Sequence, residues 1–273
     1  MIDLHTHSTV SDGSDPPARI PELAVAAGCS AVALTDHDRL DGVPAARARA
    51  RELGIELVPG CEVSCRTSWG GLHVLVYFVE PGEGPFQDRL GELQRRRDER
   101  NVKMAEALGL DHDELLAEAG GSGAGRPHAA ALLVRAGRAT SMADAFDRWL
   151  AEGRPGYVPR PRLDPAEAVA LARASGGVAV WAHPLSTGLA PADLDASVAE
   201  LAGLGLAGIE AVYGRYSPDE RAGLAELARR HGVVATGGSD HHGTYKPDLS
   251  VGVGRGDLEV PDAVLEELAA RRP

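Results

Sequence analysis

The chain has 273 residues, of which 44% are hydrophobic and 25% charged, so it can bury a sizeable core. Aromatic residues are only 4% of the total, which argues against an all-β sandwich. The formal net charge of −12 disfavours broad, non-specific binding to nucleic acid. The longest uncharged apolar stretch, residues 73–79, is too short to span a bilayer, and the first residues carry no basic leader. We therefore expect a cytoplasmic protein without membrane contact.

Short apolar segments typical of strands alternate with segments of helical spacing that are rich in Ala and Leu. The predicted strands are residues 2–5, 31–35, 56–59, 72–79, 178–182, 208–212 and 233–236. Predicted helices lie between most of them, at residues 17–27, 43–53, 165–174, 193–204 and 218–231. Seven strand-helix units in succession predict an α/β protein with a parallel sheet, closed or nearly closed into a barrel.

This rhythm is interrupted once, between the fourth and fifth strands. We predict that residues 1–85 and 161–273 form the barrel and that the helix-rich insertion 86–160 is a cap over its mouth. The insertion begins with a helical segment that carries Arg95, Arg96 and Arg97. Consecutive residues on a helix point in several directions, and such a run is expected to form a solvated face. Basic residues outnumber acidic ones within 126–160.

Histidines and carboxylates occur at or near the end of almost every predicted strand. They are His5 and His7, Asp36 and His37, Glu62, His73, His183, Glu210, and Asp240 with His242. One strand-end histidine is more often an ordinary polar group than a ligand. The carboxyl ends of parallel strands meet on one face, however, and acids and desolvated imidazoles crowded there are costly without cations. The pattern therefore predicts a metal cluster at the barrel mouth.

Several segments resemble the motifs of the PHP family, named for polymerase and histidinol phosphatase. They are Asp3-Leu4-His5-Thr6-His7-Ser8, Ser11-Asp12-Gly13, Thr35-Asp36-His37, Gly60-Cys61-Glu62, Ala182-His183-Pro184 and Gly238-Ser239-Asp240-His241-His242-Gly243. Within the family, the chain most resembles the branch of nucleoside 3',5'-bisphosphate phosphatases and the related 5'-to-3' exoribonuclease RNase AM. Gly125-Arg126-Pro127-His128 and Gly156-Tyr157-Val158-Pro159 resemble that branch too. The resemblance implies a distorted, TIM-like barrel of seven strands with a trinuclear metal site.

The resemblance also implies which residues hold the three divalent ions. His5, His7, Glu62 and Asp240 would hold the first; Glu62 would bridge to the second, with His73 and His183; and Asp12, His37 and His242 would hold the third. These nitrogen and oxygen donors suit Mn, Fe and Zn about equally, so the identity of the metal stays open. Asp36 and Glu210 lie outside the set, and the expected role of Asp36 is to support an imidazole. His241 is expected to be a neighbour and not a ligand.

Such a site implies hydrolysis of a phosphoric ester by a metal-activated hydroxide. Glu62 and His128 are the expected catalytic residues, with His128 a candidate to neutralise the leaving alkoxide. The expected substrate contacts are Arg126, His128, Arg160 and Lys246. Arg126 can engage a second phosphate through two parallel hydrogen bonds. For each arginine the alternative is an ordinary surface charge.

We therefore expect a metal-dependent phosphoesterase that acts on nucleoside 3',5'-bisphosphates, on the 5' ends of short single-stranded RNA, or on both. No stable protein partner is expected. The alternative is a histidinol-phosphatase-like or other small phosphomonoesterase, which is favoured if Arg126 and His128 lie far from the metals. A module that only binds metal or a polymerase partner is disfavoured, because the ligands that the resemblance implies are all present.

Overall fold

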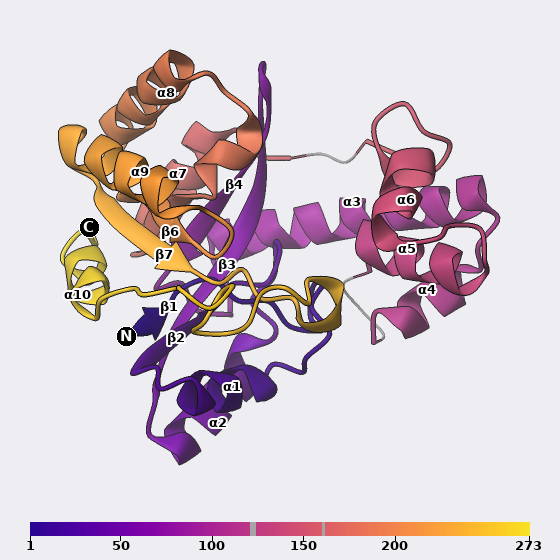
Figure 1. The fold of residues 1–273 in the computed structure, drawn as a ribbon, viewed down its shortest axis with the longest axis horizontal. Helices are drawn as coiled ribbons and strands as arrows, with labels where there is room; N and C mark the ends of the chain where they lie inside the picture. The colour runs from indigo at the N-terminus through magenta and orange to yellow at the C-terminus, as the bar shows by residue number, and fades with distance from the viewer. Residues whose placement is uncertain (121–123, 160–161) are drawn as a thin grey trace.

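The computed structural model describes residues 1–120, 124–159 and 162–273, built around one sheet of seven strands in chain order. The strands are β1 (Ile2–Asp3), β2 (Ala31–Leu34), β3 (Glu56–Thr67), β4 (Gly70–Tyr77), β5 (Val178–Ala182), β6 (Gly208–Tyr213) and β7 (Val234–Gly238). The sheet curls until its two ends meet, where the Leu4 N–H donates to the Gly237 carbonyl at 3.2 Å. The predicted α/β class, with a nearly closed barrel, is confirmed (Figure 1).

Helices cover the outside of the sheet because its strands are apolar on both faces. β2 and β5 consist entirely of buried residues, as expected of strands with core on both sides. The helices outside the insertion are α1 (Arg19–Ala26), α2 (Val43–Leu53), α7 (Pro165–Ala174), α8 (Pro191–Gly203), α9 (Pro218–Arg230) and α10 (Ala263–Ala269), with short turns η2 (Pro184–Thr187) and η3 (Gly243–Tyr245). Among the described residues, no helix combines the length and apolar composition needed to cross a membrane.

The prediction of an entirely parallel sheet is wrong at β4. β3 continues to Thr67, past the predicted end at residue 59, and the chain returns through a hairpin. β4 therefore runs antiparallel to both β3 and β5, because a two-residue connection cannot make the crossover that parallel neighbours require. In this register His73 pairs with Ala182, the last residue of β5. The reversed strand thus still brings His73 to the carboxyl end of its parallel neighbours.

The insertion between β4 and β5 is helical. It contains α3 (Pro85–Leu108), α4 (His112–Glu118), α5 (Arg126–Arg135), α6 (Met142–Ala145) and the π-helical turn η1 (Phe146–Leu150). The long helix α3 runs from the barrel to the group formed by α4, α5 and α6 (Figure 1). The insertion buries a hydrophobic cluster of its own, which includes Met104, Leu115 and Leu133 and is separate from the clusters of the barrel.

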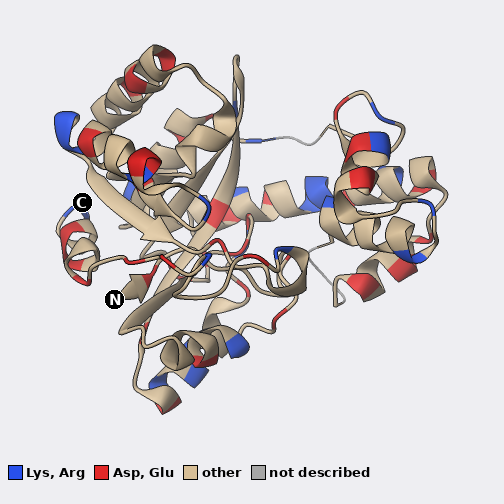
Figure 2. Cartoon of the chain, viewed as in Figure 1, with Lys and Arg blue, Asp and Glu red and all other residues tan. Residues whose placement is uncertain are grey.

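Basic residues occur along α3 (Figure 2). Arg95, Arg96 and Arg97, in the middle of this helix, do not form one solvated face. Arg95 and Arg96 are exposed, but Arg97 is only 5% exposed. Its guanidinium donates to the carbonyls of Ala124, at 3.2 Å, and His37, at 3.4 Å. Arg97 therefore ties the insertion to the mouth of the barrel. The expectation of a solvated run is wrong at this residue, because helical spacing turns it toward the interior.

Candidate metal centre and substrate pocket

The ligands that the resemblance implies all lie together at one end of the barrel. They come from segments that the sheet places side by side: Thr6, between His5 and His7, forms a β-bridge with His241, and His37 forms one with Glu62. Backbone geometry at this end is unusual, since Asp240 has φ 56° and His183 has φ 32°. Such left-handed conformations are uncommon outside glycine and often occur at functional sites.

A first group consists of His5, His7, Glu62 and Asp240, whose ligand atoms all lie within 4.8 Å of one another. Oε2 of Glu62 is 3.3 Å from Nε2 of His5 and 3.2 Å from Nε2 of His7. Oδ1 of Asp240 is 3.5 Å and 3.4 Å from the same two nitrogens. All four side chains are buried. This is the residue set implied for the first ion.

The other oxygen of Glu62 faces a second group. Oε1 lies 2.9 Å from Nδ1 of His73 and 2.9 Å from Nε2 of His183, the two residues implied for the second ion. His37 also approaches Glu62, with Nδ1 3.2 Å from Oε2, and joins Glu62 and His73 in a group that could hold a metal. The two oxygens of Glu62 thus point toward different sets of imidazoles.

A third group joins Asp12, His37 and His242, the residues implied for the third ion, with His7. Oδ1 of Asp12 is 3.3 Å from Nε2 of His242, and Oδ2 is 3.7 Å from Nε2 of His37. His7 belongs to both the first and third groups, so the three groups form one continuous cluster.

The cluster has the chemistry of a metal site. Oδ1 of Asp12 and Nδ1 of His37 are buried and, in the described structure, make no hydrogen bond of acceptable geometry, although Nε2 of His242 and Oε2 of Glu62 lie 3.3 Å and 3.2 Å away. Such atoms are candidates to bind a cation. Burial raises the pKa of Glu62, but the neighbouring imidazoles lower it more, so its pKa lies well below its usual range. Burial, with Lys246, lowers the pKa of His242 to about 4. These groups are therefore an ionised carboxylate and a neutral imidazole near pH 7, as metal ligands must be.

Glu210 orients two of the histidines. Its Oε1 is 2.9 Å from Nδ1 of His5, and its Oε2 accepts the backbone N–H of His183 at 2.8 Å. With the proton of His5 on Nδ1, the lone pair of Nε2 faces the cluster. The expectation that Asp36 supports an imidazole is not met by a direct hydrogen bond. Asp36 instead accepts from the backbone N–H and hydroxyl of Ser8 and the hydroxyl of Ser11.

Asp240 is held on its outer side by two donors. The Tyr213 hydroxyl donates to Oδ2 at 2.8 Å, and the Lys246 ammonium lies 2.6 Å from the same oxygen. Lys246, a predicted substrate contact, is therefore engaged with a carboxylate of the cluster. His241 does not face the cluster, because its Nε2 is 2.9 Å from Asp15 and its Nδ1 is 2.9 Å from the Leu249 carbonyl.

Two predicted substrate residues lie at the start of α5. Nδ1 of His128 accepts the Gly125 N–H at 3.0 Å, and its buried ring meets Tyr245 edge-on. Burial lowers the pKa of His128, while Asp12 acts to raise it. Arg126 is half-buried, and its guanidinium carbon lies 5.6 Å from the centre of the Phe146 ring. Burial lowers the pKa of Arg126. Arg97 links the start of α5 to the candidate metal centre, because its guanidinium donates to the carbonyls of Ala124 and His37.

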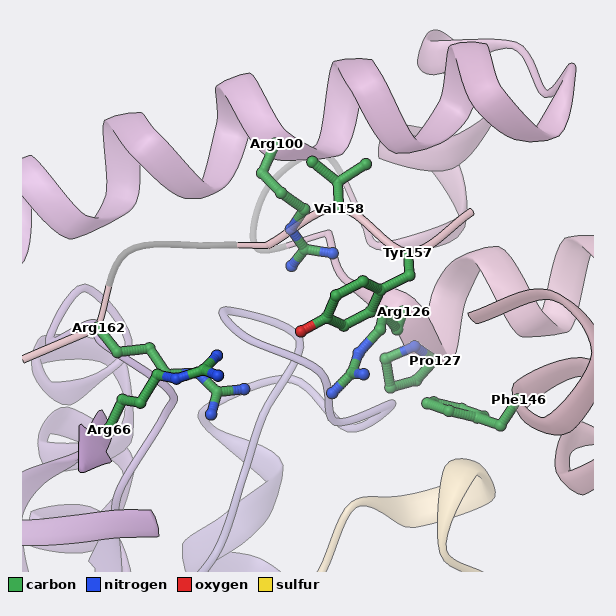
Figure 3. A pocket seen from close by; sticks show the side chains of 8 residues that line it. All are labelled: Arg66, Arg100, Arg126, Pro127, Phe146, Tyr157, Val158 and Arg162. Atoms are coloured by element: carbon green, nitrogen blue, oxygen red, sulfur yellow. The ribbon is translucent and has the colours of Figure 1, made fainter. Parts of the chain in front are cut away.

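Arg126 lines a pocket that sequence reasoning missed. Its lining includes Arg66, Arg100, Arg162 and Tyr157, whose side chains point toward one space from β3, α3 and the return to the barrel (Figure 3). No local pattern could have identified it, because these residues are far apart in the sequence. Arg160, another predicted substrate contact, lies outside the described residues.

Residues 3–154, more than half of the chain, match the family model described as the PHP domain. The chain belongs to the PHP family. Its PHP relatives include the 5'-3' exoribonuclease Rnm of Salmonella typhimurium, 36% identical over 89% of this chain and 85% of that protein. The 3',5'-nucleoside bisphosphate phosphatase of Chromobacterium violaceum is 32% identical over 92% of this chain and 90% of that protein.

A solved structure of similar extent has a similar fold. A protein from Bifidobacterium adolescentis, described as a metal-dependent phosphoesterase, superposes with a TM-score of 0.88 at 30% identity. The match covers 100% of this chain and 96% of that one. The resemblance inferred from the motifs is confirmed, as is the class of phosphoric ester hydrolase.

Proposed function

We propose that this protein is a metal-dependent phosphoesterase whose substrates are nucleoside 3',5'-bisphosphates and the 5' ends of short single-stranded RNA. One observation carries the proposal: Arg97 donates hydrogen bonds both to the carbonyl of His37, a member of the buried cluster, and to that of Ala124, which lies two residues before Arg126 in the arginine-lined pocket. A substrate with two phosphates can place one at the cluster and the other among the arginines. The two relatives are a bisphosphate phosphatase and a 5'-3' exoribonuclease, in keeping with such substrates.

The three groups of the cluster would hold three divalent cations, Mn, Fe or Zn, with Glu62 shared by two of them. When bound, such cations act as Lewis acids on the phosphoryl group and activate water for its hydrolysis. Around them, Glu210 fixes the tautomer of His5, and Tyr213 with Lys246 turns Oδ1 of Asp240 inward. These contacts hold the ligands in place before substrate arrives.

On the substrate side, Arg126 binds the phosphate that does not react. Since Nδ1 of His128 accepts a hydrogen bond and burial lowers its pKa, the ring is neutral with its proton on Nε2. In this state His128 donates a hydrogen bond to a phosphate oxygen or to the leaving alkoxide. Arg160 and Lys246 stay predicted contacts, and a phosphate at Lys246 would share the ammonium with Asp240.

The insertion 86–160 would act as a cap that admits one end of a single strand. A duplex would bring two strands of phosphates against an acidic chain, whereas a single-stranded 5' end can meet the cations and Arg126. We therefore expect mononucleotides to be released stepwise from the 5' end. On the sequence grounds given above, the cytoplasm is the expected compartment, and no stable protein partner is expected.

The alternative, a histidinol-phosphatase-like or other small phosphomonoesterase, is favoured if Arg126 and His128 lie far from the cluster. Instead both residues lie at the start of α5, which begins two residues after Ala124, whose carbonyl accepts a hydrogen bond from Arg97. Arg97 adds a direct link, since it joins the insertion to the His37 carbonyl. These contacts favour a substrate with a second phosphate.

The test is a turnover screen of the purified protein with Mn, Fe and Zn. The substrates are adenosine 3',5'-bisphosphate, a short 5'-phosphorylated RNA, histidinol phosphate and an aryl phosphate. We expect the bisphosphate and the RNA to have the highest kcat/KM, and 5'- and 3'-labelled RNA to show loss of nucleotides from the 5' end. Preference for histidinol phosphate, for duplex, or for internal cleavage would contradict the proposal.

A further inference from the structure

The arginine-lined pocket contains more positive charge than one phosphate requires. Arg66, Arg100, Arg126 and Arg162 enter it from four segments of the chain, and none of the eight described residues lining it is acidic (Figure 3). The pocket has a cavity volume of about 110 Å³. The Tyr157 hydroxyl points into the same space (Figure 3).

Arg66 and Arg162 lack the carboxylate partners that most arginines of this protein have. Arg215 and Arg221, for example, pair with Asp248 and Asp257 at 2.8 Å and 2.9 Å. Among the described residues, Arg66 and Arg162 form no ion pair, and neither does Arg126. Like charges held together in a partly buried space repel one another, and a bound anion would relieve that cost.

Arg66 and Arg162 point into the pocket from the side opposite Arg126 (Figure 3). Arg66 lies four residues beyond Glu62 along β3, so the Cα atoms of these two residues are about 13 Å apart. A phosphate monoester carries nearly two negative charges at neutral pH, and a single arginine can bind it through two hydrogen bonds. With Arg126 assigned to the non-reacting phosphate, Arg66 and Arg162 are left without a ligand.

We propose that Arg66 and Arg162 bind a third phosphate of the substrate, farther from the metal centre than the phosphate bound by Arg126. The proposal rests on the proposed function and deepens it, because it extends the substrate class beyond bisphosphates. Two kinds of substrate supply such a third phosphate. One is a nucleotide with a second phosphate on its 5' end, and the other is an oligonucleotide with a further phosphate along its backbone. Both present the same anionic oxygens to a guanidinium fork.

The test compares three substrates on the metal-loaded enzyme. They are adenosine 3',5'-bisphosphate, its 5'-diphosphate analogue, and a 5'-phosphorylated dinucleotide with a 3'-phosphate. Arg66→Gln is the main variant, because Arg66 is exposed and its replacement leaves the core intact. Arg66→Lys keeps the charge, and Arg229→Gln, on the surface of α9, is the control.

We expect the wild type to prefer one of the substrates with three phosphates over the bisphosphate. Arg66→Gln should reduce that preference by about tenfold, the loss typical of one charge-assisted hydrogen bond, whereas Arg66→Lys retains most of it and Arg229→Gln all of it. The preferred substrate identifies the source of the phosphate. Equal effects of Arg66→Gln on all three substrates, or none, would overturn the proposal.

A binding measurement separates this proposal from the proposed function. Inorganic pyrophosphate is titrated calorimetrically into the metal-depleted full-length protein, so that no cation competes for it. We expect Arg66→Gln to weaken binding by about tenfold relative to Arg229→Gln. Failure of the wild type to hydrolyse any nucleotide would refute the proposed function alone. Equal pyrophosphate affinities of the two variants would refute the pocket's role.

Discussion

Replacing Glu62 with glutamine would remove a negative charge from the point where five imidazoles meet. Its two oxygens lie 2.9–3.3 Å from ring nitrogens of His5, His7, His37, His73 and His183. The side chain is 1% exposed, so water cannot enter to solvate the imidazoles or a cation after the negative charge is lost. Loss of a group that only supports a metal ligand typically costs about 10- to 100-fold in metal affinity. Loss of a ligand shared by two cations should therefore cost at least about 100-fold, or about 2.7 kcal/mol.

The assay is metal content, measured by plasma mass spectrometry after dialysis against a fixed concentration of free metal, together with phosphate release from a nucleoside 3',5'-bisphosphate. Glu62→Gln should lose most of its metal and its activity. Glu259→Gln, which changes an exposed carboxylate in the same way, should lose neither. Circular dichroism verifies that both variants fold. A folded Glu62→Gln protein with full metal content and normal turnover would refute the assignment of Glu62 as a bridging ligand.

Three other perturbations test the surroundings of the cluster. Arg126→Ala should lower kcat/KM for a bisphosphate about 30- to 150-fold, the equivalent of about 2–3 kcal/mol, with little change for an aryl phosphate. Equal losses on both substrates would place Arg126 at the reacting phosphate. Glu210→Gln should weaken metal affinity by about 10- to 100-fold, because Glu210 lies 2.9 Å from His5 and is not among the implied metal ligands. An affinity equal to that of the wild type in a metal titration would exclude this supporting role. Burial lowers the pKa of His7, but hydrogen bonds with carboxylates raise it more, to about 9. Its proton therefore stabilises the metal-free fold fully below pH 6.5, and this contribution is lost as the pH rises through 9. Thermal unfolding of the metal-free protein should show a lower Tm at pH 9.5 than at pH 6.5, and an unchanged Tm would contradict the charge assignment.

The strand-helix rhythm and the identity of the clustered residues could be predicted from the sequence alone. Apolar periodicity reflects local burial, so α2 and α7 were predicted at the bounds that the structure has. Residues that follow neighbouring strands, such as His5 and Asp240, converge because strand ends in a barrel share a face. The motifs around them are contiguous and identify the PHP family without a structure.

Tertiary structure decided the features that depend on residues distant in sequence. The hairpin that reverses β4 could not be inferred from apolar periodicity, because a strand has the same period in either direction. Burial of Arg97 depends on carbonyls at Ala124 and His37, which only the folded insertion brings near. The pocket of Arg66 and Arg162 likewise forms only when the chain returns from the insertion to β3, where Leu163 bridges Cys65. A single sequence carries no record of such contacts, because the free energy that holds them arises only when distant segments pack together.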